Sequence, residues 1–149
     1  RVLTIEAEKV SARPAISGPQ RGAAWVAIGG GRGITSRQAF HIAERFGVRM
    51  HLVGTTPLRK DLLQENAWTL DQKESLKKTI TKQALSNRES PGKCWEPIER
   101  SIEIEETLRR FKQAGLSVAY HCCNASDSHG IQEVKQSEND IRNLPADLR

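Results

Sequence analysis

The order of apolar runs, glycines and helically spaced apolar residues in the first half of the chain predicts a strand, a turn, a helix and a second strand. Residues 24–30 form a short apolar run that ends in glycines, which is typical of a buried parallel strand. Apolar side chains recur at helical spacing over residues 34–46, and Gly47 stands where a glycine commonly ends a helix. A second apolar run covers residues 49–54. Together these segments predict a βαβ unit.

A polar segment over residues 57–100 interrupts this pattern. It predicts an insertion, because it is far longer than an ordinary loop between a strand and a helix. Within the insertion we expect a helix over residues 70–86 that is capped by Asp71. We also expect a break in the chain at Pro91-Gly92.

The alternation of helix and strand resumes after the insertion. Residues 98–114 have the spacing of a helix, and residues 116–123 form a third apolar run. A further helix is expected over residues 127–137, with Ser126 or Asp127 as its cap. This order of elements predicts an α/β fold with a doubly wound parallel sheet, incomplete at about three strands, and a helical insertion before the third strand.

The 149 residues suit one domain, or part of a larger one. We place that domain at residues 24–137, with the insertion at 57–100. Residues 1–23 are interpreted as a lead-in, because prolines and glycines interrupt any continuous helix or strand there. Residues 138–149 are interpreted as a polar tail or a truncated continuation.

Composition places the chain among soluble proteins, with 37% hydrophobic and 28% charged residues and a mean hydropathy of −0.57. No apolar run approaches the ~18 residues of a membrane-spanning helix, and no secretory signal pattern is seen. The three cysteines, Cys94, Cys122 and Cys123, cannot all pair within one chain, and the adjacent two would bridge only with strain. We therefore expect reduced thiols and a cytoplasmic location. Their spacing is not that of a zinc motif, so no metal is expected.

The net charge is +5 and the sequence pI is about 9.4, which raises the question of a polyanionic partner. The basic residues are scattered, however, and residues such as Lys77, Lys78, Arg109 and Arg110 alternate with acidic ones. This pattern favours a solvated helical face over a nucleic-acid interface. A small phosphorylated ligand also suits a mildly basic protein.

The strongest chemical signal is the run Gly-Gly-Gly-Arg-Gly-Ile-Thr from Gly29 to Thr35. It lies between a predicted strand and a predicted helix, which is the context in which a glycine pattern indicates nucleotide binding. Glycines permit a tight turn and a close approach of a pyrophosphate, and the start of the helix offers N–H groups to the anion. The alternative is a turn that binds no ligand.

In this context the stretch from Val26 to Thr35 closely resembles the cofactor turn of ketoreductase domains in polyketide and polyunsaturated fatty acid synthases. Those domains belong to the short-chain dehydrogenase/reductase superfamily, which has a Rossmann-like sheet. Residues 50–58 resemble the second strand and its cofactor loop. Residues 102–109 and 118–127 resemble the helix before the third strand and the third strand itself.

The resemblance implies NADPH binding and reduction of a β-ketoacyl thioester to a β-hydroxyacyl thioester, in polyketide or fatty acid biosynthesis. The substrate would be carried on an acyl carrier protein. The cofactor-binding residues implied by the resemblance are Gly29, Gly30, Gly31, Arg32, Gly33, Ile34, Thr55, Thr56, Arg59, Asn124 and Ala125.

Within that set, the resemblance places Arg32 at the pyrophosphate, although it is also interpretable as a plain surface residue. Thr55 and Thr56 stand where the family contacts the adenosine ribose. Arg59 or Lys60 would meet the 2′-phosphate, because no acidic residue ends the second strand to bind a free 2′-hydroxyl. The alternative for these two residues is a pair of solvated charges.

The chain departs from the family pattern in several places. Ile28 replaces a usual Thr, and Asn124 replaces the Asp that contacts the adenine amino group. The family's catalytic Tyr-x-x-x-Lys pair with its Ser is missing, since the only tyrosine is Tyr120, within a predicted strand. We therefore expect a cofactor-binding portion without catalytic residues, whose partner is the remainder of a synthase or reductase. The alternative is a non-catalytic Rossmann-like module that braces a reductase partner.

Other candidate residues favour structural roles. His121 and Cys122 are adjacent in a strand and point to opposite faces, which favours a core strand over a Cys–His nucleophile. His51, like His41, is expected to be partly buried or at the surface. The two tryptophans of the insertion are expected to anchor its helices onto the sheet; they are Trp68 and Trp95.

Acidic residues cluster on the helix that precedes the third strand. Glu103 and Glu106 are neighbours on one helical face, and we expect that face to be solvated. Glu105 and Arg109 have the spacing of a favourable ion pair.

Overall fold

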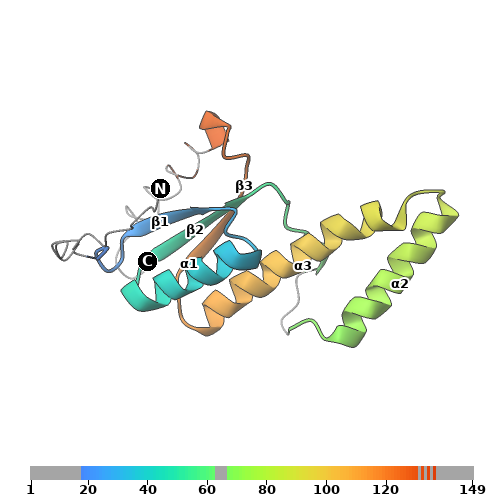
Figure 1. The fold of residues 1–149 in the computed structure, drawn as a ribbon, viewed down its shortest axis with the longest axis horizontal. Helices are drawn as coiled ribbons and strands as arrows, with labels where there is room; N and C mark the ends of the chain where they lie inside the picture. The colour runs from blue at the N-terminus through green and yellow to red at the C-terminus, as the bar shows by residue number, and fades with distance from the viewer. Residues whose placement is uncertain (1–17, 63–66, 131, 133, 135, 137–149) are drawn as a thin grey trace, which may run out of the picture.

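The computed structural model describes residues 18–62, 67–130, 132, 134 and 136. Its centre is a parallel sheet of three strands in the order β1-β2-β3. The strands are β1 (Ala24–Ile28), β2 (Arg49–Gly54) and β3 (Val118–Cys122). Figure 1 shows the three strands lying side by side. The predicted α/β fold with an incomplete, Rossmann-like parallel sheet is confirmed, because this order is one βαβαβ half of a doubly wound fold.

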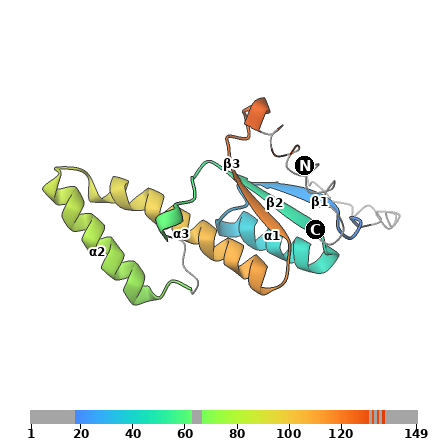
Figure 2. The same ribbon diagram turned by 180° about the vertical axis from the view of Figure 1, so that it is seen from behind.

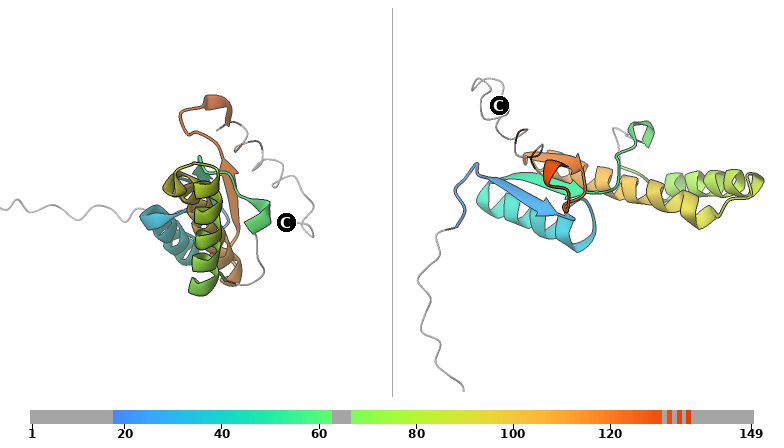
Figure 3. Two further views of the ribbon diagram at one scale, coloured as in Figure 1. Left: turned by 90° about the vertical axis from the view of Figure 1, so that its right-hand side faces the viewer. Right: turned by 90° about the horizontal axis from the view of Figure 1, so that it is seen from above.

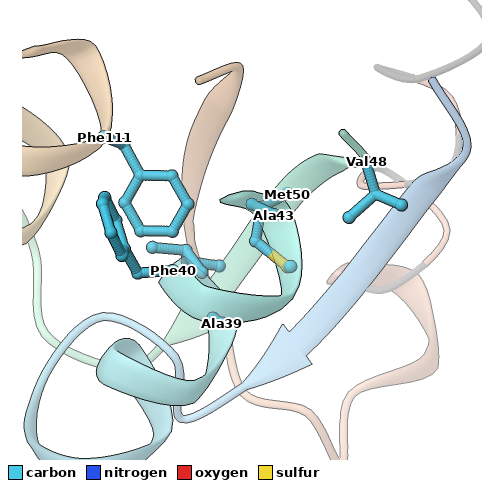
Figure 4. Packing of buried hydrophobic residues seen from close by; sticks show 7 residues of the cluster. Ala39, Phe40, Ala43, Val48, Met50 and Phe111 are labelled. Atoms are coloured by element: carbon cyan, nitrogen blue, oxygen red, sulfur yellow. The ribbon is translucent and has the colours of Figure 1, made fainter. Parts of the chain in front are cut away.

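Two helices cover the same face of the sheet. They are α1 (Gly33–Phe46) and α3 (Pro91–Gln113), which connect the strands in sequence. Met50 and Leu52 point from β2 into the core that these helices close. In that core the rings of Phe40 and Phe111 meet edge to face, with 5.2 Å between their centroids (Figure 4). The core therefore joins β2 to both helices.

The insertion is a helical hairpin that extends away from the sheet. It consists of α2 (Leu70–Ser86) and the first half of α3. Figure 3 shows the two helices running side by side beyond the strands. A short 3-10 turn, η1 (Lys60–Leu62), lies between β2 and the hairpin. The same arrangement is seen from behind in Figure 2.

The amino end of α2 corrects the expected cap. The N-cap is Thr69, whose hydroxyl accepts from the Gln72 backbone N–H at 3.2 Å, while the Gln72 side chain accepts from the Thr69 backbone N–H at 2.9 Å. This reciprocal capping box satisfies two N–H groups that a helix leaves unpaired. Asp71 lies inside the first turn instead, where its charge suits the helix dipole.

The expected break at Pro91-Gly92 is wrong. Pro91 begins α3, because a proline at the first helical position loses an N–H that has no partner there in any case. The reversal between the helices lies before it and includes Arg88, whose φ is 57°. The helix expected over residues 98–114 therefore starts seven residues earlier, at Pro91, and it accommodates Pro97 within it.

The tryptophans of the insertion do not anchor it onto the sheet. Trp95 belongs to a second core between α2 and α3, and Trp68 packs against that core. The remaining members of this hairpin core are Leu62, Ile98, Ile102, Leu76 and Ile80. The hairpin thus has a core of its own, separate from the one beneath the sheet.

After β3 the chain turns through Asn124 to Asp127, and Ser128–Gly130 are helical. The Asp127 carboxylate accepts from the His129 backbone N–H at 3.0 Å, so Asp127 is the cap, one of the two predicted. The rest of the helix expected over residues 127–137 lies partly outside the described residues, as do most of the lead-in and the tail. Within the described part of the chain, no helix has the length and apolar character that crossing a membrane requires.

Candidate functional site

A cavity of about 440 Å³ opens where β1 and β2 end. That volume lies within the ~300–1,000 Å³ typical of small-molecule sites. The carboxyl ends of parallel strands are also where doubly wound folds bind ligands. The cavity is lined by Gly29, Gly31, Arg32, Gly33, Gly54, Thr55, Thr56, Arg100, Glu103, Ile104 and Tyr120.

The glycine turn forms one wall of this cavity. Gly29 and Gly33 have φ angles of 72° and 65°, a region that glycine adopts without strain. A Cβ at either position would meet no atom within 4 Å, so the space beside this backbone is open. At Gly33 the chain enters α1, which has neither a side-chain cap nor an acidic residue in its first turn. The turn therefore leaves the positive end of a helix dipole available to an anion.

Gly31 is required by packing rather than by a turn. A Cβ on it would lie 2.9 Å from Cε2 of Tyr120 and 3.2 Å from Cγ1 of Ile104. Gly54 is similar, since its Cβ would lie 2.8 Å from the Tyr120 hydroxyl. That hydroxyl donates a 2.7 Å hydrogen bond to the Thr56 carbonyl. Tyr120 thus holds the loop after β2 against the glycine turn, and burial raises the pKa of its phenol.

Two charged side chains face each other across the turn. A guanidinium nitrogen of Arg32 lies 3.4 Å from a carboxylate oxygen of Glu103 on α3. Both side chains are about half exposed, so solvent weakens the attraction. The expected solvated face holds for Glu103, which is exposed, while Glu106 is half-buried and pairs with Lys73 of α2 at 2.7 Å.

Arg59, which was predicted to bind the 2′-phosphate, does not line the cavity. The guanidinium of Arg59 makes two contacts with the Asp61 carboxylate, at 3.1 and 2.5 Å. The hydrogen bond from Asp61 raises the pKa of Arg59, and that of Asp61 is lowered by the same bond. The backbone N–H of Arg59 donates to the Ser101 hydroxyl at 3.0 Å, which ties this loop to α3. The side chain of Lys60 lies outside the described residues.

The residues after β3 also lie away from the cavity wall. The Asn124 side-chain oxygen accepts from the Ser126 backbone N–H at 3.0 Å, a local turn that Asn commonly makes. Asn124 and Ala125 are exposed, and neither lines the cavity. Ile28 and Ile34, at 62% and 79% exposure, project into solvent. Gly30 is buried beneath the turn, where a Cβ would lie 2.8 Å from the Ala27 carbonyl oxygen.

The structure thus gathers six of the eleven sequence-predicted residues at one cavity: Gly29, Gly31, Arg32, Gly33, Thr55 and Thr56. Five lining residues were not anticipated: Arg100, Glu103, Ile104, Gly54 and Tyr120. The first three share one face of α3 at positions i, i+3 and i+4. The helical spacing of the sequence around residue 100 indicates that these three residues share a face. Nothing in the sequence indicates what that face contacts.

The residues present fit a dinucleotide phosphate in part. Open space over two glycines, the uncapped start of α1 and the Arg32 side chain suit a pyrophosphate. Two threonines at the end of β2 supply hydroxyls for a sugar. Across the described residues, no group of three or more His, Cys, Asp or Glu side chains is arranged to hold a metal ion.

The histidines of the sheet form a pair on the face opposite the helical core. His51 is only 3% exposed, so the expectation of a partly buried or surface residue is corrected. Its Nδ1 lies 2.9 Å from Nε2 of His121, and the two rings are stacked. Burial lowers the pKa of His121, and the neighbouring His51 lowers it further. Cys122, next along the strand, is exposed, and neither it nor the half-buried Cys94 forms a disulfide.

On α3 the predicted ion pair between Glu105 and Arg109 is confirmed, with an N–O distance of 3.0 Å. Both side chains are nearly buried. Burial raises the pKa of Glu105, and the charge of Arg109 opposes that shift. This pair supports the helix beneath the site and does not line the cavity.

Comparison with known proteins adds no further assignment. No family model matches the sequence, and neither the curated proteins nor the solved structures that were searched include a match. The fold and the cavity stand on the geometry described above.

Proposed function

We propose that this chain is the NADPH-binding part of a ketoreductase that reduces a β-ketoacyl thioester to a β-hydroxyacyl thioester. The observation that carries the proposal is the cavity that joins the glycine turn after β1 to Thr55 and Thr56 after β2. A dinucleotide needs both features together, since one suits its phosphates and the other its ribose. The resemblance of the glycine turn to synthase ketoreductases supplies the substrate class.

Each part of the cavity has a separate task under this proposal. The N–H groups at the start of α1 and the Arg32 guanidinium hold the pyrophosphate. The hydroxyls of Thr55 and Thr56 bind the adenosine ribose, and Tyr120 fixes their loop through the Thr56 carbonyl. When bound, NADPH supplies the hydride that attacks the ketone carbon.

Protonation of the resulting alkoxide requires an acid, and none of the described residues that line the cavity is assigned that task. Tyr120 is the only tyrosine, and its hydroxyl already donates to a backbone carbonyl. We therefore assign the proton donor to a partner, the remainder of a synthase or reductase, which also binds the carrier-borne acyl chain. The chain itself contributes cofactor binding.

A second candidate function is a non-catalytic module that braces a reductase partner. Two observations favour it: Arg32 is paired with Glu103, and the Asn124 side chain is used in its own turn. In this case the cavity is a relic and the exposed side chains of β1 form the contact surface. Such a module folds, associates with a catalytic partner and ignores NADPH.

A matched pair of glycine variants tests the proposal. Gly33→Asp places a charged side chain in the open space beside the turn. Gly115→Asp places one before the amino end of β3, whereas the cavity lies at the carboxyl ends of β1 and β2. The two positions have nearly equal φ angles, 65° and 67°, and both have open space at the Cβ. Backbone strain is therefore matched, while the two positions differ in their distance from the cavity.

Binding is followed by tryptophan fluorescence, with Trp25 in β1 as the reporter, during titration with NADPH. We expect saturable binding by the unsubstituted chain and by Gly115→Asp, and loss of binding in Gly33→Asp because its carboxylate repels the phosphates. Equal binding by all three proteins would contradict a site at the glycine turn. Failure of the folded, unsubstituted chain to bind NADPH would leave the bracing module as the better account.

A further inference from the structure

NADPH carries two separate anionic groups, the pyrophosphate and the 2′-phosphate, and a site that holds both needs hydrogen-bond donors or positive charge at each. Two arginines line the cavity, Arg32 from the glycine turn and Arg100 from α3. Among the described residues of the lining, Glu103 is the only acidic one, and it is paired with Arg32. The second arginine is therefore the charge at this cavity that Glu103 leaves available.

Arg59, which the sequence pattern favours for the 2′-phosphate, is held elsewhere. Both of its contacts are with one carboxylate, that of Asp61 two residues further along, in the two-point arrangement that suits arginine best. The side chain is not part of the cavity wall. Moving it to a phosphate there would require both contacts with Asp61 to break.

Arg100 is placed differently. It shares one face of α3 with Glu103 and Ile104, and all three line the cavity. Within the described part of the chain its side chain makes one ion pair, from one terminal nitrogen to Glu96 one turn earlier on the helix. A guanidinium has five N–H donors, so the others remain to bind a phosphate. Its side chain is 40% exposed, which leaves it accessible from the cavity.

The end of β2 completes the argument. The chain continues from Gly54 into two threonines, with no acidic residue to accept from a free 2′-hydroxyl. A cavity without that acid, but with an arginine on the facing helix that keeps donors beyond its contact with Glu96, suits a phosphorylated ribose. We propose that Arg100 recognises the 2′-phosphate and sets a preference for NADPH over NADH. This inference rests on the proposed function.

The test measures dissociation constants for NADPH and NADH with the unsubstituted chain, Arg100→Gln and Arg59→Gln. Both variants remove one partly exposed arginine that pairs with a near neighbour in sequence, so they are matched for charge and exposure. A charge-assisted hydrogen bond contributes about 1.5–3 kcal/mol, so Arg100→Gln should weaken NADPH binding by roughly 10- to 150-fold. NADH binding should change by less than about twofold, and Arg59→Gln should keep the original ratio. Arg100→Lys should restore part of the preference, because it retains a cation.

The outcomes separate this inference from the function on which it rests. If the unsubstituted chain prefers NADPH and Arg59→Gln removes that preference while Arg100→Gln retains it, the assignment to Arg100 is overturned and the proposed function stands. Equal losses of NADPH and NADH binding in Arg100→Gln would also overturn it, since they would indicate general support of the cavity. If the folded chain binds neither nucleotide, both proposals fail together.

Discussion

At the scale of single residues, the cavity is shaped by contacts between distant parts of the chain. Tyr120 on β3 lies against Gly31 and Gly54, so glycine at both positions is explained by the ring beside it. The ion pair between Arg32 and Glu103 has a different consequence. It neutralises the charge that a pyrophosphate would meet, so an incoming anion must compete with a carboxylate.

Replacing that carboxylate should therefore improve binding. We predict that Glu103→Gln tightens NADPH binding by several-fold, on the order of 0.5–1 kcal/mol, because an exposed ion pair contributes little more than this. Glu99→Gln is the matched control, since Glu99 lies about one turn earlier on α3 and does not line this cavity. Fluorescence titrations of both variants give the comparison. Weaker binding in Glu103→Gln would show that Glu103 supports the site.

The stacked pair of His51 and His121 predicts a dependence of stability on pH. The folded state holds the pKa of His121 below its ordinary value. At a pH between the lowered pKa and the ordinary one, the unfolded chain therefore binds more protons than the folded chain. The contribution of His121 is fully present above about pH 6.5 and is lost as the pH falls through its lowered pKa. Urea unfolding at pH 7.5 and pH 5.5 should show the loss, and His121→Phe, which keeps an aromatic ring against His51, should reduce it. An equal loss in His121→Phe and the unsubstituted chain would contradict this cause.

The site could be predicted from the sequence only where it is local in the chain. Gly29, Gly33, Thr55 and Thr56 stand at strand ends, and a strand end can be found from an apolar run. Arg100 and Tyr120 reach the same cavity only because α3 and β3 pack there, and no local pattern encodes that. Arg59 is the reverse case: its place in the sequence favoured a phosphate contact, but its side chain is paired with Asp61 and does not line the cavity.

At the scale of elements, the bounds of two segments were predicted correctly. The apolar run at 49–54 and the helix expected at 70–86 match β2 and α2. The start of α3 was missed because Pro91 and Gly92 are usual chain breakers, and only the position of the proline at the first helical residue makes it acceptable. The packing of α2 on α3 rather than on the sheet is a tertiary fact that helical spacing alone does not contain.

The separate hairpin core makes a prediction about cooperativity. Trp95 is 8% exposed at the centre of that core, so Trp95→Ala should cost about 3–5 kcal/mol locally. Because this core is distinct from the one beneath the sheet, amide hydrogen exchange should accelerate in α2 far more than in β2. Leu85→Ala, at a 63% exposed position of α2, should leave the exchange rates of α2 and β2 unchanged. Uniform acceleration across α2 and β2 would show that the two cores unfold as one.

At the scale of the whole molecule, β1 is the exposed side of the sheet. Among the described residues it pairs only with β2, and its side chains Val26 and Ile28 are 52% and 62% exposed. Both lie on the face opposite the helices, in register with His51 and Val53, which are buried. An apolar strand with an open edge is a surface for pairing with a partner or with another copy.

We predict concentration-dependent self-association of the isolated chain through β1. The double variant Val26→Thr with Ile28→Thr should shift the chain toward monomer, because threonine retains the preference for a strand but removes apolar surface. Leu70→Thr, at an 81% exposed position on α2, is the control and should leave association unchanged. Sedimentation velocity over a range of concentrations measures the effect. A compact monomer at every concentration would contradict the prediction.

A map of where NADPH binds tests the proposed cofactor site most directly. In a titration of the full chain followed by backbone amide NMR shifts, we expect saturable changes at Gly29–Ile34 and at Gly54–Thr56, while the amides of α2 remain unchanged. That result would locate the dinucleotide at the cavity between the glycine turn and the end of β2. Saturable shifts confined to the α2–α3 hairpin, or no shifts in a folded sample, would contradict the account.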